Sequence, residues 1–333
     1  MNNEFSSLNL SPALQDNLAS LGYLQMTPIQ AQSLPLVLDG KDLIAKAKTG
    51  SGKTAAFGLG LLANLDVNRL EVQALVLCPT RELADQVATE IRRLARTLPN
   101  VKLVTLCGGT PTAPQSATLS FGAHIAVGTP GRILKHLEQG TLDLDGLKTL
   151  VLDEADRMLD MGFGEDINRV ISHAPRDRQT LLFSATYPEG IAQMSRGVQR
   201  NPVEVSVESL HEDSAIEQKL YEVPAGQRLD ALTWLLSHYQ PGPCVVFCNT
   251  KRACNDVADH PAAKGFSALA LNGDLEQRER DQVLVRFANG SATILVATDV
   301  AARGLDIKEL GAVINYELTS DPEGHVHRIG RTG

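Results

Sequence analysis

The sequence has few cysteines, few aromatic residues and no surplus of positive charge. Its 333 residues include 5 cysteines, an odd number without a CxxC pair, which argues against a disulfide framework. Cys244, Cys248 and Cys254 do not lie among histidines at the spacing of zinc ligands. We therefore interpret all of the cysteines as structural thiols.

The charge balance argues, at first, against a nucleic-acid ligand. The chain has 31 lysine and arginine residues against 39 aspartate and glutamate residues, which gives a net charge of −8. Proteins that bind nucleic acids usually carry a basic face that neutralises phosphates. A nucleic-acid partner would therefore have to be held mainly by other groups.

Long apolar runs are also missing. No uncharged apolar stretch approaches the roughly 20 residues that span a bilayer. The start, MNNEFSSLNL, lacks the basic and apolar regions of a signal peptide, so we expect a cytoplasmic protein. With 333 residues and 43% hydrophobic content, the chain exceeds the usual length of one domain, and two globular domains are expected.

Short aliphatic runs alternate with amphipathic stretches along the chain. The runs DLIAKA, QALVLCPT, VKLVTLC, HIAVGTP, TLVLDE and TLLFSAT are bounded by turn residues, as is typical of strands buried on both faces. A second series follows from residue 216, in EQKLYEV, CVVFCN, SALALN, TILVATD and AVINYEL. The alternation with helix-like segments such as RELADQVATEIRRLARTL predicts an α/β protein with parallel sheets flanked by helices.

A polar, acidic stretch separates the two series of runs. This stretch, NPVEVSVESLHEDSAIEQ at residues 201–218, suits a connector between domains. We therefore predict a first domain over residues 1–207, a linker over residues 208–215 and a second domain over residues 216–333.

The strongest chemical signal is AKTGSGKT, residues 47–54, which lies between a predicted strand and a predicted helix. Gly50 and Gly52 would let successive backbone N–H groups point at one anion near the helix N-terminus. Lys53 would reach the β- and γ-phosphates of a nucleotide, and Thr54 would hold Mg²⁺. Alanine replaces the first glycine of the GxxxxGK pattern, and a plain glycine turn is the alternative for this stretch alone.

An acidic cluster ends another aliphatic run. In KTLVLDEADR, residues 148–157, three acids follow directly on a predicted buried strand, where a surface turn is the simplest explanation. A phosphate-binding turn, however, needs a carboxylate at the end of a second buried strand to hold the metal opposite Thr54. Asp153 is the predicted metal ligand, and Glu154 is the predicted general base that activates water for attack on the γ-phosphate.

These motifs, with others in the same order, resemble those of the DEAD-box ATP-dependent RNA helicases of superfamily 2 over essentially the whole chain. The matching stretches are GYLQMTPIQ, AKTGSGKT, PTRELA, GG at 108–109, TPGR, DEAD, SAT, VVFCNT, QRER, ATDVAARGLDI and HRIGRTG. Stretches such as DEADRMLDMGF and GDLEQRERDQ are most similar to the bacterial DbpA type, which is associated with ribosomal RNA. The resemblance implies an RNA-stimulated ATPase with two RecA-like domains, the second truncated at its C-terminus.

The resemblance also assigns nucleotide-binding roles to matching residues. Gln30 would read the adenine edge, because a carboxamide both donates and accepts hydrogen bonds, and Tyr23 would stack on the base unless it packs in the core. Asp299 would contact the ribose, and Arg331 would act as an arginine finger on the γ-phosphate. ATP and Mg²⁺ are the expected ligands. The predicted nucleotide and metal set is Tyr23, Gln30, Thr49, Gly50, Ser51, Gly52, Lys53, Thr54, Asp153 and Asp299, and the catalytic set is Lys53, Asp153, Glu154, His327, Arg328 and Arg331.

RNA would be held along its sugar-phosphate backbone by helix N-termini and loop amides, which answers the charge objection. Single-stranded RNA would be recognised by shape and by the 2′-hydroxyl, with little base specificity. The predicted contacts are Thr80, Arg81, Gly109, Thr129, Gly131 and Arg132 in the first domain, and Thr250 and Gly304 in the second.

A coupling mechanism follows from the same resemblance. Ser184 and Thr186 resemble the motif that links hydrolysis to domain closure, and His327 with Arg328 resembles the motif that joins the two domains around the nucleotide. ATP and RNA together would close the domains, bend one strand and locally separate a short duplex. We expect a monomer that remodels ribosomal RNA or assists ribosome assembly.

The sequence departs from the family pattern in two places. Asn272 stands where family members commonly have histidine, a change that we expect to be mild. The chain stops at Gly333, before the second arginine finger that follows in the family, so we expect a fragment with impaired hydrolysis and a partly exposed apolar edge.

Three alternatives stay open. A GTPase or kinase is disfavoured, because no NKxD motif occurs and a second domain with its own arginine motif would be unexplained. An RNA clamp that binds ATP and RNA with little turnover fits the missing arginine, and ATP hydrolysis measured beside RNA binding distinguishes it. A DNA helicase of the same superfamily would respond to deoxyribose strands.

Overall fold

The computed structural model describes residues 3–47, 50–207, 216–224, 226–302, 310–319 and 322–329. The chain divides into two compact units, Met1–Ser209 and Leu210–Gly333. No helix in the described residues is long and apolar enough to cross a membrane.

The first unit is built on a parallel sheet with the strand order β3-β4-β2-β5-β6-β1-β7. Its registers pair, for example, Leu43 with Leu181 and Val76 with Val151. The strands are β1 (Leu43–Lys46), β2 (Ala74–Leu77), β3 (Leu103–Leu106), β4 (Ile125–Gly128), β5 (Thr149–Leu152), β6 (Gln179–Ser184) and β7 (Val203–Ser206). The central strands β2, β4, β5 and β6 are buried throughout, which explains their continuous aliphatic sequences.

Helices cover both faces of this sheet, because successive strand residues point to opposite sides. Thus Val76 packs in one apolar core with α2 and α3, whereas Leu75 and Leu77 pack in the other with α8. The helices of the first face are η1 (Phe5–Ser7), α1 (Pro12–Ser20), α2 (Pro28–Leu38), α3 (Lys53–Ala63) and α4 (Arg81–Leu94). Those of the second are α6 (Pro130–Glu138), α7 (Ala155–Asp160), α8 (Gly164–Ser172) and α9 (Glu189–Val198).

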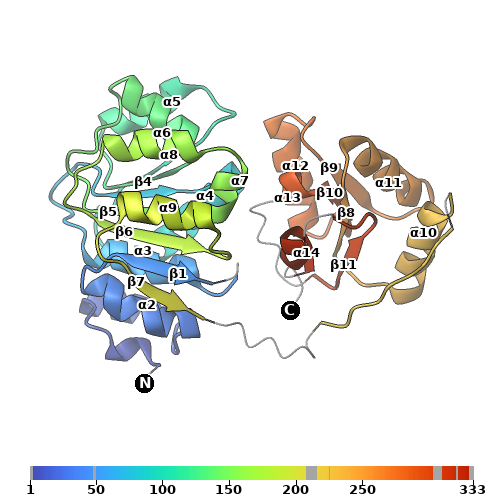
Figure 1. Cartoon of the computed structure of the whole chain (residues 1–333), viewed down its shortest axis with the longest axis horizontal. Coiled ribbons are helices and arrows are strands. Elements are labelled where there is room, and N and C mark those ends of the chain that lie inside the picture. The colour runs from blue at the N-terminus through green and yellow to red at the C-terminus, as the bar shows by residue number, and fades with distance from the viewer. Residues whose placement is uncertain are drawn as a thin grey trace. The chain divides into compact units, whose positions relative to one another are not determined.

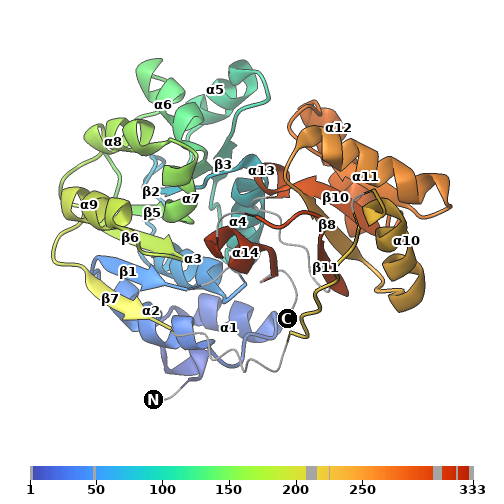
Figure 2. The same cartoon turned by 45° about the vertical axis from the view of Figure 1, so that its right-hand side comes forward.

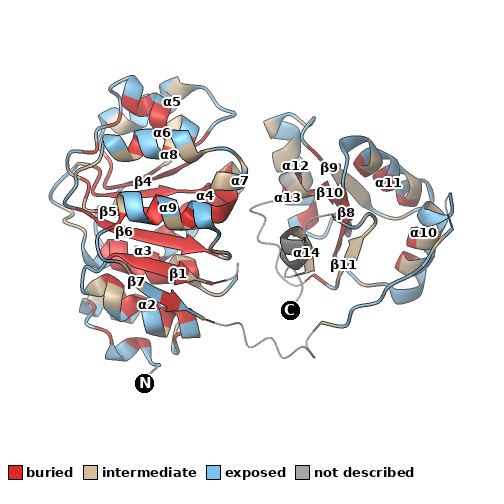
Figure 3. Cartoon of the chain, in the orientation of Figure 1, coloured by how far each residue is buried: buried red, intermediate tan, exposed pale blue. Residues whose placement is uncertain are grey.

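The figures show this layering in the first unit. The helices α6, α8 and α9 lie along one side of the sheet (Figures 1 and 2), and the strands are coloured as buried while the outer faces of the helices are exposed (Figure 3). One helix differs from the others: α5 (Thr112–Ser120) has no buried residue. The position of α5 is therefore not fixed by deep apolar packing.

The second unit repeats the plan on a smaller scale. Its described strands form a parallel sheet with the order β11-β8-β10-β9. They are β8 (Cys244–Cys248), β9 (Ala268–Leu271), β10 (Ile294–Thr298) and β11 (Ala312–Asn315). The helices are α10 (Arg228–Tyr239), α11 (Lys251–Ala263), α12 (Gln277–Ala288), α13 (Asp299–Ala302) and α14 (Pro322–Ile329). Residues of α10 and α11 pack on one face of the sheet, and residues of α12 and α13 pack on the other.

The expected fold class, two parallel sheets flanked by helices, is confirmed, with two corrections in detail. The run EQKLYEV, residues 217–223, forms no strand, and Leu220 and Tyr221 are exposed because no core receives them. Conversely, part of the stretch that suited a connector forms a strand: Val203–Ser206 is β7, which pairs with β1. The predicted linker over residues 208–215 lies outside the described residues.

Candidate functional site

The predicted site residues of the first unit follow the carboxyl ends of its parallel strands, which all meet at one edge of the sheet. The nucleotide motifs follow β1, β5 and β6, which are neighbours in the sheet. The RNA motifs follow β3, β4 and β2, which are also neighbours. Because β2 pairs with β5, the two predicted sites adjoin along one edge.

The glycine turn after β1 has the backbone conformation that its sequence requires. Gly50 and Gly52 have φ values of +82° and +92°, in the left-handed region that favours glycine. A Cβ atom added at Gly52 would lie 2.5 Å from Gln30 Nε2, so a side chain there would be crowded as well as strained. Thr49 lies outside the described residues.

Gln30 connects this turn to the start of α2 by hydrogen bonds. Its Nε2 donates to Gly52 O at 3.0 Å and its Oε1 accepts from Thr27 N at 2.8 Å. Thr27 Oγ1 donates in turn to Ser51 O at 2.8 Å. Gln30 is buried, and a carboxamide has one further N–H and one further lone pair that could meet a base. Its reading of adenine stays a prediction, and Thr27 is a contact that the sequence analysis missed.

Lys53 and Asp153 face each other inside the site. Lys53 Nζ lies 4.0 Å from Asp153 Oδ1, both side chains are buried, and neither atom has a hydrogen-bond partner within the described residues. Buried charged groups are ordinarily hydrogen-bonded, so this pair fits ligands that supply the missing contacts. A phosphate would satisfy the ammonium, and a divalent cation would satisfy the carboxylate. Burial raises the pKa of Asp153 to about 6, and the Lys53 ammonium opposes the shift only in part.

Magnesium would need ligands beyond the acidic side chains. The part of the chain that the structure describes contains no group of three or more His, Cys, Asp or Glu side chains that could hold a metal ion. Thr54 follows Lys53 in the first turn of α3 and is partly exposed. Asp153 and Thr54 would provide only two of the ligand groups, and Mg²⁺ typically takes the remainder from phosphate and water.

Glu154 has an unusual backbone conformation. Its φ of +53° and ψ of +51° are left-handed, which is uncommon for a residue with a side chain and is often found at functional sites. Its Oε2 accepts from Arg157 Nη1 at 2.9 Å, and both side chains are buried. Arg157 was not among the predicted site residues, and helical spacing does not indicate this pair, because Glu154 precedes α7 in a left-handed conformation.

Asp156 joins the acidic turn to the residues after β6. Its Oδ2 accepts from Thr186 N at 2.9 Å and from Thr186 Oγ1 at 3.0 Å, while its own N–H donates to Ser184 Oγ at 3.3 Å. Burial would raise the pKa of Asp156, but hydrogen bonds from Thr186 and Arg157 outweigh burial and lower it. The two predicted coupling residues are therefore bonded to the DEAD turn through an acid to which the sequence analysis gave no role.

Tyr23 is packed against protein groups. Its hydroxyl donates to Glu90 Oε1 at 2.6 Å, its ring meets Phe5 edge to face, and the Arg93 guanidinium lies 5.6 Å from the ring centroid. Burial and the Glu90 carboxylate raise the pKa of the phenol to about 12. The core-packing alternative describes Tyr23 in this structure, and stacking on a base stays a prediction.

The predicted RNA contacts of the first unit lie at turns and helix starts. Thr80 caps α4, and its Oγ1 accepts from Leu83 N at 3.2 Å. Gly109 has a φ of +80° in an exposed loop. Thr129 precedes α6, and Gly131 is exposed in its first turn. Helix starts can present backbone N–H groups to an anion, but the N–H of Thr129 itself donates to Leu106 O at 3.2 Å. The remaining two, Arg81 and Arg132, have protein partners: Arg81 lies 3.6 Å from Asp85 Oδ2, and Arg132 is bonded to Gln115.

Arg328 is the centre of a buried network in the second unit. It is 2% exposed, and its five hydrogen bonds match the five N–H donors of a guanidinium. Two of these bonds, at 2.6 Å each, form a bidentate pair with Asp299. The others join Asn249, Asn315 and the Glu317 carbonyl, which follow or end β8 and β11. Arg328 thus holds together the carboxyl ends of three strands and fixes Asp299.

The other predicted residues of the second unit are less fully described. Thr250 caps α11, and its Oγ1 accepts from Ala253 N at 3.1 Å. His327 lies on α14, but its side chain is outside the described structure, as are Gly304 and Arg331. Roles in RNA contact or phosphate contact for these residues stay predictions.

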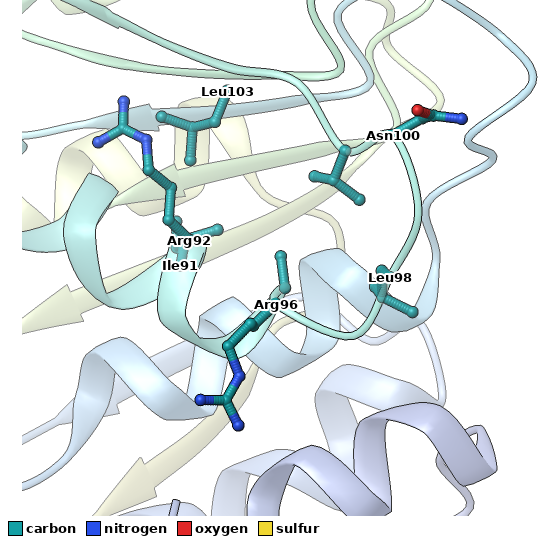
Figure 4. Close-up of a pocket in the computed structure, with 8 residues that line it drawn as sticks. Ile91, Arg92, Arg96, Leu98, Asn100 and Leu103 are labelled. Carbon is teal, nitrogen blue, oxygen red and sulfur yellow. The ribbon is translucent and has the colours of Figure 1, made fainter.

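A cavity of about 250 Å³ lies away from these motifs (Figure 4). It is lined by residues at the C-terminal end of α4 and in the segment before β3, among them Arg92, Arg96, Leu98 and Asn100. Helix α4 has 14 residues, so this end is about 20 Å from Thr80 at the helix start, given a rise of 1.5 Å per residue. The cavity is therefore not part of the predicted site.

Comparison with known proteins shows the family of this chain. Residues 27–194 match the family described as DEAD/DEAH box helicase, and residues 227–333 match the helicase conserved C-terminal domain. The chain is 62% identical over 329 residues to the ATP-dependent RNA helicase DbpA of Escherichia coli, and the match covers 98% of this chain and 72% of that protein. The chain therefore belongs to the DEAD-box family of ATP-dependent RNA helicases.

Solved structures agree with this assignment. Saccharomyces cerevisiae Dbp5 bound to RNA and ADP BeF3 is 31% identical, with a TM-score of 0.88 over 99% of this chain and 86% of that one. A DEAD box protein from Methanococcus jannaschii is 40% identical, with a TM-score of 0.61 over 99% of this chain and 90% of that one. The resemblance inferred from the motifs, and the enzyme class of an ATP-dependent RNA helicase, are confirmed.

Proposed function

We propose that this protein uses ATP and Mg²⁺ to separate short RNA duplexes locally, and that ribosomal RNA is its substrate. The observation that carries the proposal is the buried pair Lys53 and Asp153, whose facing Nζ and Oδ1 atoms lack hydrogen-bond partners in the described residues. The adjoining RNA motifs along the same sheet edge support coupling of hydrolysis to RNA. The choice of ribosomal RNA rests on the resemblance of the motifs to the DbpA type, and the chain is 62% identical to E. coli DbpA.

The nucleotide chemistry follows from the residues of the first unit. Lys53 would bind the β- and γ-phosphates, while Asp153 and Thr54 would hold Mg²⁺. The metal, when bound, would neutralise phosphate charge and so favour attack at the γ-phosphate. Glu154, held by Arg157, would accept the proton of the attacking water. In this scheme Arg157 orients the base and does not touch the substrate.

Coupling to RNA would use the network behind the DEAD turn. Asp156 bonds Thr186 and Ser184, so a movement of the phosphate-side turn would be passed to the segment after β6. We infer that ATP and RNA each favour a closed arrangement of the two units and that hydrolysis releases it. Closure would bend the bound strand and thereby separate a short duplex, and the protein would work as a monomer.

Steady-state ATPase and duplex-separation assays test the proposal. Glu154→Gln should lower RNA-stimulated ATPase by about 10²- to 10⁴-fold, the usual effect of removing a general base, while ATP binding is kept. Lys53→Ala should lose ATP binding. Glu165→Gln, at an exposed position of α8, is the matched control and should match the parent. Parental turnover in Glu154→Gln or Lys53→Ala would contradict the proposed roles.

The RNA class needs its own measurement. ATPase stimulation by ribosomal RNA fragments should exceed stimulation by unrelated RNA of equal length and by the same strands in deoxyribose form. Equal stimulation by all RNAs would remove ribosomal RNA as the preferred substrate and leave the helicase activity in place. Stimulation by the deoxyribose strands would contradict an RNA helicase.

A further inference from the structure

The loop after β3 has little apolar packing beyond its first residue, Cys107, which is buried in the core. Gly108, Gly109 and Thr110 are exposed, and the helix that follows, α5, buries none of its residues. Leu119 of α5 is partly buried against the second core, but residues 108–110 bury no side chain, and ordering their backbone costs about 1–2 kcal/mol per residue. Polar contacts are therefore expected to help fix residues 108–110.

Gln115 on α5 supplies such contacts. Its Nε2 donates to Cys107 O at 3.0 Å and to Thr110 Oγ1 at 3.2 Å, so it spans the two ends of the loop. Its Oε1 accepts from Arg132 Nη1 and from His136 Nε2, both at 2.9 Å and both on α6. These four bonds use the full hydrogen-bonding capacity of a carboxamide.

Arg132 and His136 complete the connection from α6. Arg132 Nη2 donates to Thr110 O at 2.8 Å, which gives the loop a second link to the same helix. His136 is fully buried, and its Nδ1 lies 2.8 Å from Thr141 Oγ1. Burial, aided by Arg132 and Lys135, lowers the pKa of His136. The neutral ring with its proton on Nε2 satisfies Gln115, since Nε2 then donates to Oε1. Nδ1 then shares the Thr141 hydroxyl proton with the His136 carbonyl, to which Thr141 Oγ1 donates at 3.2 Å.

We propose that Gln115 is a positioning residue for RNA binding: it locks the loop over residues 107–110 to the start of α6, so that the two elements present one preformed surface to the RNA backbone. The inference rests on the proposed function, since it takes the edge beyond β3, β4 and β2 to be the RNA surface. Gln115 itself need not touch RNA. Its contribution is to remove the cost of ordering the loop when RNA binds.

The same geometry gives Arg132 a bridging role. Both of its terminal nitrogens donate within the protein, one to Gln115 and one to the Thr110 carbonyl. A planar guanidinium can span two acceptors in this way, whereas a lysine ammonium at the same place keeps the charge but not the fork. If Arg132 acted on RNA only through its positive charge, the variant Arg132→Lys would keep the RNA affinity of the parent.

Fluorescence anisotropy with a short labelled single-stranded RNA and a non-hydrolysable ATP analogue tests the proposal on the full chain. Gln115→Met keeps the side-chain length and removes the four hydrogen bonds. We expect it to weaken RNA binding by about 10- to 100-fold, which corresponds to reordering one or two loop residues. The slope of log Kd against log salt should stay that of the parent, because no phosphate-neutralising cation is lost. Arg132→Lys should weaken binding as much as Arg132→Met.

Gln139→Met is the matched control, since Gln139 is exposed at the end of α6, and it should bind RNA as the parent does. ATP affinity and melting temperature of each variant report folding. An RNA affinity of Gln115→Met within about twofold of the parent would overturn the proposal. Should Gln115→Met fail to fold, Arg132→Lys decides, because parental RNA affinity in that variant would equally overturn it.

Failure of the underlying RNA surface gives a different result. Gly131→Asp places a negative charge at an exposed position in the first turn of α6. If the parent binds RNA and Gly131→Asp binds it equally well, the proposed RNA surface is wrong. If Gly131→Asp loses RNA affinity while Gln115→Met keeps it, only the positioning role of Gln115 is wrong.

Discussion

Replacement of Arg328 by methionine should selectively destabilise the second unit. The guanidinium is buried and donates five hydrogen bonds, two of them to Asp299. Removing one partner of a buried ion pair typically costs about 3–5 kcal/mol. The Asp299 side chain is 34% exposed, so water would partly solvate the stranded carboxylate. We therefore expect a loss near the lower end, about 3 kcal/mol.

Urea unfolding followed by tryptophan fluorescence measures this effect. The chain has a single tryptophan, Trp234 on α10, so the signal reports the second unit. Its indole stacks on the His238 ring at 4.7 Å, and separation of the rings on unfolding should change the emission. With a dependence of about 2 kcal/mol per molar urea, the midpoint should fall by about 1.5 M.

Two comparisons make the result decisive. Arg252→Met, at a side chain that is 94% exposed on α11, should change stability by no more than about 0.5 kcal/mol. ATP-analogue binding by the first unit should persist in Arg328→Met. A midpoint shift below about 0.5 M would refute the view that Arg328 holds the second sheet together.

Three further predictions concern the first unit and the thiols. Gly52→Ala should lower ATP affinity by at least about tenfold, and it should lose more stability than Gly140→Ala. Both positions have positive φ, but only a Cβ at Gly52 would meet Gln30. Equal losses of ATP affinity and stability in the two variants, measured by isothermal titration and thermal unfolding, would contradict the crowding argument. Tyr23→Phe removes a phenol whose pKa in the folded protein is about 12. The parent should therefore be more stable than this variant below pH 10, and the difference should vanish between about pH 10 and 12. A difference in the free energy of unfolding that stays constant over this pH range, measured by chemical unfolding, would contradict the prediction. All of the thiols are buried, and burial raises the pKa of each: Cys78, Cys107, Cys244, Cys248 and Cys254. Alkylation at pH 8 should therefore occur only after unfolding. Rapid labelling of the native protein, detected by mass spectrometry, would contradict this prediction.

The sequence was a good guide wherever the determining interactions are local. Aliphatic runs such as ALVL and TLVL predict strands because both faces of a buried parallel strand need apolar residues. Gly50 and Gly52 predict the phosphate turn because a positive φ is a property of single residues. The acids after β5 were placed correctly because parallel strands bring their carboxyl ends to one edge.

Strand pairing and long-range polar contacts could not be predicted from the sequence. Residues 217–223 have an alternating strand-like pattern but are not in a strand, whereas Val203–Ser206 pairs with β1 although its surroundings are polar. A strand exists only if a partner edge is available, which the local pattern cannot state. The hydrogen bonds of Gln115 join positions up to 21 residues away, and those of Arg328 up to 79. No spacing rule links such positions.

The sequence alone determined which chemical groups this protein has and the order in which they occur, since motifs and strand patterns depend only on residues that are neighbours in the chain. Only the tertiary structure decided which of those groups are free to meet a ligand. Among the residues that the structure describes, it left the Lys53 ammonium and an Asp153 oxygen without hydrogen-bond partners, and it used every N–H donor of Arg328 within the second unit. The reason is that satisfaction of a buried polar group depends on neighbours brought together from distant strands.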